Sequence, residues 1–302
     1  MKTHKKILIV GGTGFIGYHL AKEAISRKWR VTSISLTKPK KKRFLNKVKY
    51  VLCDITNYKK LSKKIKNDYD FVINFGGHVD HKNKKKTYRS HYLGCKNLIK
   101  FFLKNEIKSF IQIGTGGEYG NLNSPHKENL FFKPKSGYAY AKFLASQYSL
   151  KMHKKKNFPS TIIRLYQVYG SLQDTNRFLP VLITNCINNK SFSTSNGQQY
   201  RDFIHVKDVT NAIFKCFNSE KCRGKIINIG FGTPIKIKDI ILKVKKYCKG
   251  GKPIFGKIKL RKDENFKTYP NISRAKSLLK WKPKISFRKG LLSTIQSYYE
   301  NK

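Results

Sequence analysis

Acidic residues, tryptophan and long apolar runs are all scarce in this chain of 302 residues. Only 16 residues are acidic, against 65 lysines and arginines, so the formal net charge is +49. The apolar runs are far shorter than the roughly 20 residues that a membrane-spanning helix needs, which argues against an integral membrane protein. Hydrophobic residues still make up 39% of the chain, enough for a folded globule with one large core or two joined cores.

Cysteine is also sparse, and its spacing excludes two classes of site. No C-x-x-C pair and no metal-ligand spacing occurs, so we expect neither a zinc site nor a disulfide framework. A reduced, cytoplasmic setting with free thiols fits best, and no bound metal is expected. The six cysteines are Cys53, Cys95, Cys186, Cys216, Cys222 and Cys248.

The surplus of positive charge admits two interpretations. Arginine contributes only 11 of the 65 basic residues, and the lysine runs, such as 40–43, lie at element ends where solvated charge is cheap. This indicates a bias in composition, because phosphate recognition favours arginine as well. A pI near 10.2 is also typical of nucleic-acid-binding proteins, so a surface selected for polyanions or membranes stays open. We favour the compositional interpretation and expect no specific nucleic-acid or membrane partner.

The order of predicted elements indicates an α/β fold. Short runs rich in valine, isoleucine and phenylalanine predict buried strands at 5–10, 31–36, 48–52, 70–75, 109–114 and 160–165. Helical spacing between them predicts helices at about 16–28, 57–66, 90–104 and 138–154. Strands that alternate with helices are typical of a Rossmann-type, doubly wound parallel sheet.

After about residue 170 the spacing of the elements changes. Helices are predicted at 177–189, 238–248, 273–280 and 287–299, with short strands near 192–194, 203–205 and 225–229. We therefore predict a Rossmann domain over residues 1–168 and a smaller C-terminal, substrate-binding lobe over 169–302. Whether the segment of about 200–230 returns to the first domain is left open.

The stretch GGTGFIG follows the first apolar run. Gly11, Gly14 and Gly17 have the spacing G-x-x-G-x-x-G between a predicted strand and a predicted helix. Residues without a Cβ allow a tight turn, and the free N–H groups of a helix N-terminus bind a pyrophosphate. A purely structural glycine turn is the alternative. The alternating pattern behind it favours a dinucleotide site, with Phe15 and Ile16 in the same turn.

The stretch SGYAYAK contains a tyrosine and a lysine four residues apart. This separation places Tyr138 and Lys142 on one face of a helix. The ammonium is predicted to lower the pKa of the phenol, so that the tyrosine can transfer a proton near neutral pH. An ordinary surface pair is the alternative. Tyr140 is rejected, because it lies two residues from the lysine and points to another face.

These motifs together resemble the extended short-chain dehydrogenase/reductase family, usually called NAD-dependent epimerase/dehydratase. GGTGFIG is its typical opening, and RDFIHVKDV (201–209) is typical of its nucleotide-sugar members. HYLGCKNL is similar to the family's N-V-x-G-T-x-N-L helix, with His91 replacing the usual asparagine. The resemblance covers roughly residues 6–298. It implies a nicotinamide cofactor, a nucleotide-sugar substrate bound by the C-terminal lobe, and a homodimer that pairs the helices near 90–104 and 138–154.

The resemblance also implies which residues bind the cofactor. The CDIT stretch lies beside the adenine in the family, and the INFGG stretch flanks the cofactor. Tyr138 and Lys142 of the catalytic pair touch it as well. The contacts implied by these two stretches are Asp54, Ile55, Phe75, Gly76 and Gly77.

In IQIGTGGEYG, Thr115 occupies the place of the family's catalytic serine or threonine and completes a triad with the tyrosine and lysine above. In the 4,6-dehydratases of the family an Asp-Glu pair follows this threonine and acts as acid and base. Gly116 and Gly117 stand there in this chain, which argues against a dehydratase. Glu118 comes one residue late. A shifted base is the alternative, but the following EYG matches the family's V-Y-G without a gap.

The end of the second predicted strand bears on the choice of nicotinamide. NAD-binding members carry an acid there that accepts hydrogen bonds from the adenosine ribose. Ser35 stands in its place, followed by Thr37 and Lys38. The missing carboxylate would not repel a 2′-phosphate, so NADP(H) is favoured, while NAD(H) stays open.

The predicted substrate contacts come from the resemblance. RLYQVYG is similar to the family's R-x-x-N-V-Y-G, with Gln167 in place of the asparagine that touches the sugar. Arg201 and Arg261 stand where the family grips the diphosphate, with Arg177 a weaker candidate. A structural ion pair is the alternative for each arginine. For His78 and His81, a solvated loop position is favoured over a place in the sugar site.

Three functions are weighed. The favoured one is NAD(P)H-dependent reduction of the 4-keto group of a CDP- or dTDP-linked 4-keto-6-deoxyhexose, by resemblance to reductases that make deoxysugars such as abequose. The alternative is an NAD-dependent 4-epimerase of UDP-hexoses with the same triad. A non-catalytic, polyanion-binding member of the fold is the third. The base, the sugar and the stereochemistry at C4 are not determined by these residues.

Overall fold

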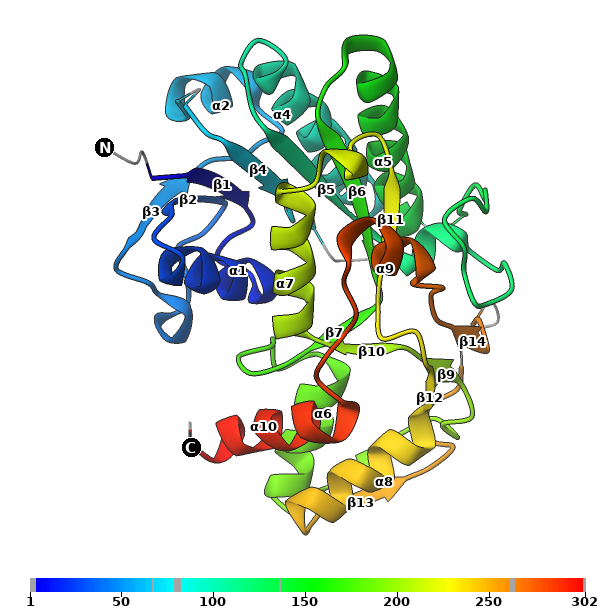
Figure 1. Ribbon diagram of the computed structural model, residues 1–302. Coiled ribbons are helices and arrows are strands. Elements are labelled where there is room, and N and C mark those ends of the chain that lie inside the picture. Colours follow the sequence, from blue (N-terminus) through cyan, green and yellow to red (C-terminus); the bar gives the residue numbers. More distant parts are fainter. Residues whose placement is uncertain (1–3, 67, 79–82, 136, 261–263, 301–302) are drawn as a thin grey trace.

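The computed structural model describes residues 4–66, 68–78, 83–135, 137–260 and 264–300. Its largest element is a parallel sheet of seven strands in the order β11-β6-β5-β4-β1-β2-β3, which confirms the predicted Rossmann-type α/β fold (Figure 1). The six strands predicted for this sheet are all present, and β11 adds an edge strand. The strands are β1 (Lys6–Val10), β2 (Arg30–Ser35), β3 (Val48–Leu52), β4 (Phe71–Asn74), β5 (Ser109–Thr115), β6 (Ser160–Leu165) and β11 (Ile226–Ile229).

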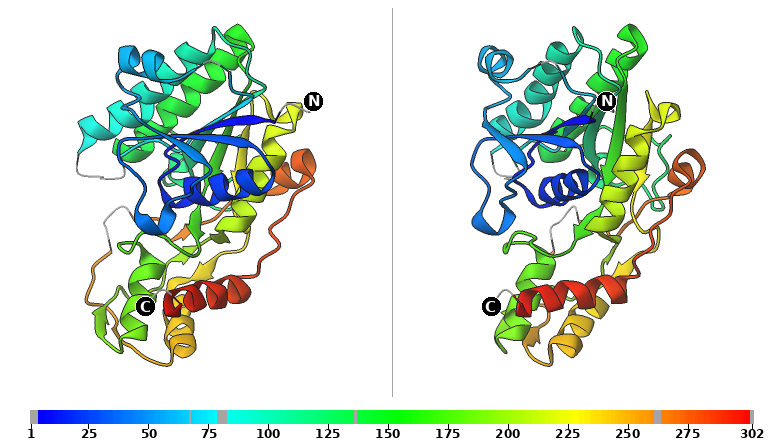
Figure 2. Two further views of the ribbon diagram at one scale, coloured as in Figure 1. Left: turned by 90° about the vertical axis from the view of Figure 1, so that its left-hand side faces the viewer. Right: turned by 60° about the vertical axis from the view of Figure 1, so that its left-hand side comes forward.

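Helices cover both faces of the sheet, because its strands are apolar on both sides (Figure 2). In β1, Ile7 and Ile9 face one core, and Leu8 and Val10 face the other. Burial on both faces explains why these strands are unbroken apolar runs. The first core is covered by α1 (Phe15–Ser26), α7 (Val206–Phe217) and α9 (Ser273–Leu279), and the second by α2 (Tyr58–Lys64), α4 (Gly94–Phe102) and α5 (Gly137–Lys156).

Two helical stretches differ from the prediction. The helix expected over 90–104 begins earlier, as α3 (Lys84–Tyr88), passes through a π-helical turn, η2 (Arg89–Leu93), and continues as α4. The sequence analysis missed α7, although Val206, Val209 and Ile213 repeat at helical spacing and are buried. Together with β11, α7 returns the chain from the C-terminal part to the sheet.

A smaller lobe lies below the sheet in Figure 1. It is built on α6 (Phe178–Ile187), α8 (Ile237–Cys248) and α10 (Phe287–Tyr299), which enclose a third apolar core. The domain boundary after residue 168 stays a prediction. Short strands complete this part of the chain: β7 (Gln167–Tyr169) pairs with β10 (Phe203–His205), β8 (Ser191–Ser193) with β13 (Lys252–Ile254), and β9 (Tyr200–Arg201) with β12 (Ile235–Lys236) and β14 (Lys267–Thr268).

The six cysteines are all buried and unbridged. Within the described ranges, no helix is long and apolar enough to cross a membrane. The same residues contain no group of three or more His, Cys, Asp or Glu side chains that could hold a metal ion.

In the glycine turn between β1 and α1, the loop backbone lies close to the backbone at the start of the helix. Gly11 has a φ of +81°, and its carbonyl accepts a hydrogen bond from the Gly14 N–H at 3.0 Å. A Cβ on Gly17 would lie 2.4 Å from the Gly11 oxygen and 2.7 Å from the Gly12 Cα. The third glycine therefore lets the first turn of α1 sit directly on the loop.

Replacing Gly17 with alanine should lower the free energy of unfolding by about 1–3 kcal/mol, because the new methyl group forces the turn away from α1. Urea denaturation measures the change. Gly117→Ala is the matched control, since a Cβ there would meet its nearest atoms at 3.6–3.7 Å. Equal stability of the two variants would contradict the role assigned to Gly17.

Candidate active site

Two loops at the carboxyl ends of β1 and β4 lie against each other. The Gly11 N–H donates to the Ile34 carbonyl at 2.7 Å, and the Phe75 N–H donates to the Val10 carbonyl at 2.9 Å. A Cβ on Gly11 would be 3.3 Å from the Gly76 nitrogen. These predicted cofactor segments therefore meet at the edge of the sheet where open α/β folds bind their ligands.

The CDIT segment reaches the same region from β3. Ile55 is buried, and its Cδ1 atom would lie 3.2 Å from a Cβ on Gly76. Its carbonyl accepts a hydrogen bond from Asn97 Nδ2 at 2.9 Å. The exposed Asp54 accepts the Thr56 N–H at 2.8 Å through one carboxylate oxygen. Ile55 therefore lies beside the loop that contains Gly76, and the neighbouring Asp54 carboxylate is exposed to solvent.

Ser35 ends β2 beside the glycine turn. Its Oγ atom accepts the Thr13 N–H at 3.4 Å, and Lys38 is exposed a short distance along the chain. Phe15 and Ile16 are turned into the protein, where Ile16 packs on the first core. These two residues can therefore offer a ligand little more than their backbone N–H groups at the start of α1.

A buried arginine next to the turn was missed by the sequence analysis. Arg43 lies in η1 (Lys41–Arg43) and is 6% exposed. Its guanidinium donates to the Thr13 carbonyl at 3.5 Å, to the Leu172 carbonyl through Nε at 3.0 Å, and to Asp174 at 2.9 Å. Assigning the whole run 40–43 to solvated charge is thus wrong for Arg43, which ties the turn to the loop after β7. The sequence feature that could have pointed to this buried residue is an arginine within a lysine run of an arginine-poor chain.

A buried carboxylate holds the end of β5 in place. Glu118, in η3 (Gly116–Tyr119), accepts the Thr115 N–H at 2.8 Å through one oxygen. Its other oxygen accepts two N–H groups of Arg164, at 2.9 and 3.1 Å. The Thr115 hydroxyl accepts the Gly117 N–H at 3.2 Å. Because both oxygens are engaged, Glu118 is a structural partner of the arginine and not a shifted catalytic base.

The position after Thr115 is closed by an aromatic ring. A Cβ on Gly116 would lie 2.7 Å from the Cε1 atom of Tyr166. The Tyr166 hydroxyl is 3.1 Å from Nδ1 of the buried His126, which holds the ring against the glycine. A carboxylate side chain at this position would collide with the tyrosine. The sequence has no acid directly after Thr115, and the structure leaves no room for one at Gly116.

Tyr138 and Lys142 lie one turn apart on α5, as their spacing predicts. Lys142 is buried, and its ammonium donates to the Ile113 carbonyl at 2.8 Å. Burial lowers the pKa of Lys142 to about 8. Burial also raises the pKa of Tyr138 to about 12; the charge of Glu118 adds to this shift, and the guanidinium of Arg177 opposes it. The predicted lowering of the Tyr138 pKa is therefore wrong, because desolvation outweighs the effect of nearby cations.

Two more rings near the tyrosine can be placed. The ring of Tyr140 stacks on that of Phe143, with ring centroids 6.5 Å apart, so the neighbour of this ring is Phe143 and not Lys142. His91 lies edge-on to Tyr138, with ring centroids 5.2 Å apart and an interplanar angle of 84°. The sequence analysis noted His91 as a departure from the family's asparagine but assigned it no role.

Two of the predicted substrate residues face solvent near the site. Arg177 is the exposed N-cap of α6, and its charge reaches the Tyr138 phenol, as the pKa of that group indicates. Gln167 is exposed at the start of β7, and its N–H donates to the Asp202 carbonyl at 3.0 Å. Arg177, the weaker candidate of the sequence analysis, is therefore the better placed arginine.

The structure gives less support to a substrate-binding role for the other two predicted arginines. Arg201 pairs with Glu264 and donates to the Tyr200 carbonyl at 2.7 Å, which is the structural ion pair held open as the alternative. Its grip on a diphosphate stays a prediction. Arg261 and His81 lie outside the described residues. The backbone N–H of the partly buried His78 donates to Ser90 Oγ at 2.9 Å.

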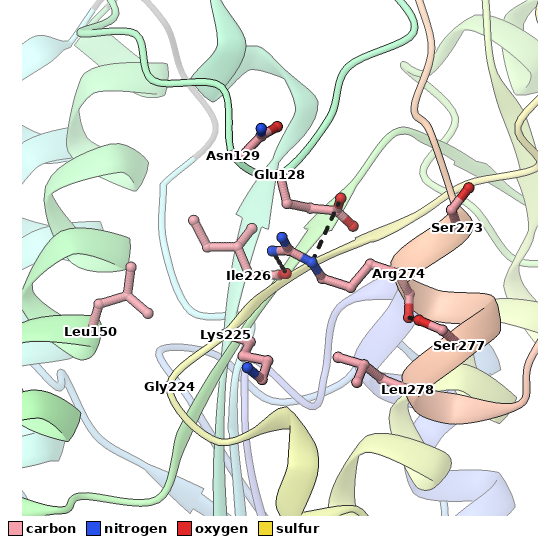
Figure 3. A pocket seen from close by; sticks show the side chains of 10 residues that line it. All are labelled: Glu128, Asn129, Leu150, Gly224, Lys225, Ile226, Ser273, Arg274, Ser277 and Leu278. Atoms are coloured by element: carbon pink, nitrogen blue, oxygen red, sulfur yellow. Dashed lines mark hydrogen bonds and ion pairs between the residues drawn. The ribbon is translucent and has the colours of Figure 1, made fainter.

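A cavity of about 680 Å³ opens elsewhere, at the edge of the sheet beside β11 (Figure 3). Arg274 spans it, donating to the Ile226 carbonyl at 3.0 Å and lying 3.9 Å from the Glu128 carboxylate. None of the predicted site residues lines this cavity, so it is separate from the candidate active site.

Comparison with known proteins agrees with the geometry. The model of the NAD-dependent epimerase/dehydratase family matches residues 7–230. A putative UDP-glucose 4-epimerase of Methanocaldococcus jannaschii is 29% identical, over 94% of this chain and 95% of that protein. A dTDP-glucose 4,6-dehydratase of Streptomyces niveus is 22% identical, over 98% and 94%. The crystal structure of UDP-glucose 4-epimerase from Thermotoga maritima shares the fold, with a TM-score of 0.91 and 21% identity over 98% of this chain and 99% of that one.

Replacing Glu118 with glutamine should lower the free energy of unfolding by about 3–5 kcal/mol, because it leaves the Arg164 charge buried and unpaired. Adding Arg164→Met should recover part of this loss, since the uncompensated charge is then removed. Chemical denaturation of the single and double variants measures both effects. Glu23→Gln, in the exposed pair with Arg27, is the matched control and should cost less than about 1 kcal/mol. Losses at Glu118 and Glu23 of the same size would refute the structural role.

Proposed function

This chain belongs to the NAD-dependent epimerase/dehydratase family, and on that premise we propose that it is an NADPH-dependent reductase. The proposed substrate is a CDP- or dTDP-linked 4-keto-6-deoxyhexose, whose 4-keto group is reduced to an alcohol. The observation that carries this proposal is the pair Gly116 and Gly117 directly after Thr115. Removal of water from a hexose needs an acid and a base at the site, and these two positions offer neither.

The proposed roles of the chain's own residues follow from their placement. A nicotinamide cofactor, with its pyrophosphate held at the glycine turn, would supply the hydride to C4 of the sugar. Tyr138 donates the proton to the oxygen at C4, and the Thr115 hydroxyl hydrogen-bonds that oxygen. A pKa of about 12 keeps the phenol of Tyr138 protonated near neutral pH, which suits a donor of protons better than an acceptor. The nearby charge of Arg177 stabilises the phenolate that remains.

The choice of NADPH is supported by the end of β2. Ser35 is a neutral residue beside the turn, and the buried Arg43 lies 3.5 Å from the Thr13 carbonyl. The charge of Arg43 is balanced by Asp174, so the exposed Lys38 on the same loop would supply the positive charge that attracts a 2′-phosphate. NAD(H) is the alternative cofactor.

A 4-epimerase of UDP-hexoses is the second candidate, and the relatives favour it. The relative from M. jannaschii is named a putative UDP-glucose 4-epimerase, and the structure from T. maritima is a UDP-glucose 4-epimerase. An epimerase would use the same triad, but Tyr138 would first have to accept a proton from the sugar hydroxyl.

The deciding experiment presents the purified protein with 4-keto-6-deoxyhexoses linked to CDP or dTDP, together with NADPH. We expect loss of the nicotinamide absorbance and a new alcohol at C4, identified by NMR. Tyr138→Phe should slow this reaction by at least about 100-fold, because the proton donor is lost. Tyr140→Phe is the matched control and should keep the rate of the unaltered protein.

Three outcomes would overturn the reductase. Interconversion of UDP-hexoses without ketoreduction would favour the epimerase. Binding of nucleic acid that weakens steeply with salt, with no turnover of any sugar, would favour the polyanion-binding alternative. Full activity of Tyr138→Phe would remove the tyrosine from the mechanism.

Introducing an acid at the end of β2 tests the cofactor. Ser35→Asp should weaken NADPH binding by at least about tenfold and affect NADH little, because the new carboxylate repels the 2′-phosphate. Fluorescence titration of the two cofactors measures the change. Ser277→Asp, at an exposed position on α9 beside the separate cavity, is the control. An unchanged preference between NADPH and NADH in Ser35→Asp would contradict the assignment.

A further inference from the structure

His91 makes contacts that no step of the proposed reaction uses. It lies in the π-helical turn η2 and is 2% exposed. Its Nε2 atom is 3.0 Å from the His78 carbonyl. A carbonyl can only accept, so Nε2 carries the proton and Nδ1 keeps its lone pair. Burial, followed by the charge of Lys142, lowers the pKa of His91 to about 3, so the ring is neutral near pH 7.

The imidazole also presses on the loop that flanks the predicted cofactor site. Gly77 has a φ of +149°, and a Cβ there would lie 1.8 Å from Cε1 and 1.9 Å from Nδ1 of His91. The neighbouring Ser90 accepts the His78 N–H at 2.9 Å. Two consecutive residues of η2, Ser90 and His91, thus hydrogen-bond the N–H and the carbonyl of His78. Gly77 fits beside the imidazole only because it has no side chain.

The ring of His91 also contacts Tyr138, the proposed proton donor. His91 and Tyr138 meet edge to face, with centroids 5.2 Å apart. This geometry is the favoured one for aromatic pairs, and it fixes the position of a ring more than its chemistry. His91 therefore contacts both the loop at Gly77–His78 and the tyrosine.

We propose that His91 is a positioning residue that sets the distance between the Gly77–His78 loop and the Tyr138 ring. The imidazole is a rigid spacer: its N–H holds the loop, and its ring holds the tyrosine. Asparagine at this position would lose the ring contact, and its shorter side chain would not reach the His78 carbonyl as Nε2 does. This inference rests on the proposed role of Tyr138, and it assigns His91 no proton transfer.

Two substitutions separate the two contacts. His91→Asn loses both the ring and the donor that reaches the His78 carbonyl, whereas His91→Phe keeps the ring and loses only the donor. In single-turnover measurements with saturating NADPH and keto sugar, His91→Asn should slow hydride transfer by roughly 10- to 100-fold, because a small displacement of a catalytic group costs that much. Since both variants lose the same hydrogen bond, the substrate KM and the NADPH Kd should differ by less than about twofold between them. His91→Phe should recover most of the rate.

His205→Asn is the matched control. His205 is also buried and also meets a tyrosine edge to face, Tyr169, with centroids 5.4 Å apart and an angle of 83°. Tyr169 packs in the third apolar core and is not a residue of the triad, so the control should lose stability without losing rate. A normal rate in His91→Asn, or an equal loss of rate in His205→Asn, would overturn the proposal.

A readout without turnover keeps the test independent of the proposed function. With tyrosines labelled at the ring carbon Cζ, the NMR signal of Tyr138 is the one that Tyr138→Phe removes. It should broaden and shift in His91→Asn, stay sharp in His91→Phe, and be unchanged in His205→Asn. If the unaltered protein reduces no keto sugar, the proposed function fails, while this signal still decides the role of His91. An unmoved Tyr138 signal in His91→Asn refutes that role.

Discussion

The buried ion pair between Glu118 and Arg164 is the interaction on which the rest of the site depends. It joins β5 to β6 and holds the backbone of Thr115. Arg164 also lies over the ring of Tyr119, 4.4 Å from its centroid, and the Tyr119 hydroxyl donates to Asn228 in β11 at 2.8 Å. Three neighbouring strands are thus locked together at their carboxyl ends. Since either charge alone would be costly in the interior, the two residues form one unit.

This unit also shapes the chemistry. A carboxylate stands three residues after Thr115, yet the arginine and the threonine backbone occupy both of its oxygens. Its field still reaches the site, where it adds to the rise in the pKa of Tyr138. Burial is the larger cause of this rise, and the charge of Glu118 adds to it.

Three of the 11 arginines carry structural or electrostatic tasks around the site. Arg43 ties the glycine turn to the loop after β7, Arg164 locks the sheet, and Arg177 stands near the phenol. A planar guanidinium can serve several acceptors at once, which suits it to crossing between elements. Two lysines also join elements: the buried Lys142 holds α5 to β5 through the Ile113 carbonyl, and Lys215 of α7 donates to the Leu279 carbonyl at the end of α9.

The sequence by itself determined the sheet, the glycine turn, the spacing of Tyr138 and Lys142 and the lack of an acid at Gly116 and Gly117. These features depend on local rules, namely the two-sided burial of parallel strands, the backbone freedom of glycine and the helical repeat. Only the tertiary structure decided that Glu118 is engaged, that Arg43 is buried and that the pKa of Tyr138 rises. Pairing and ionisation depend on burial and on partners distant in the chain, such as Arg164 for Glu118, and no local pattern encodes them.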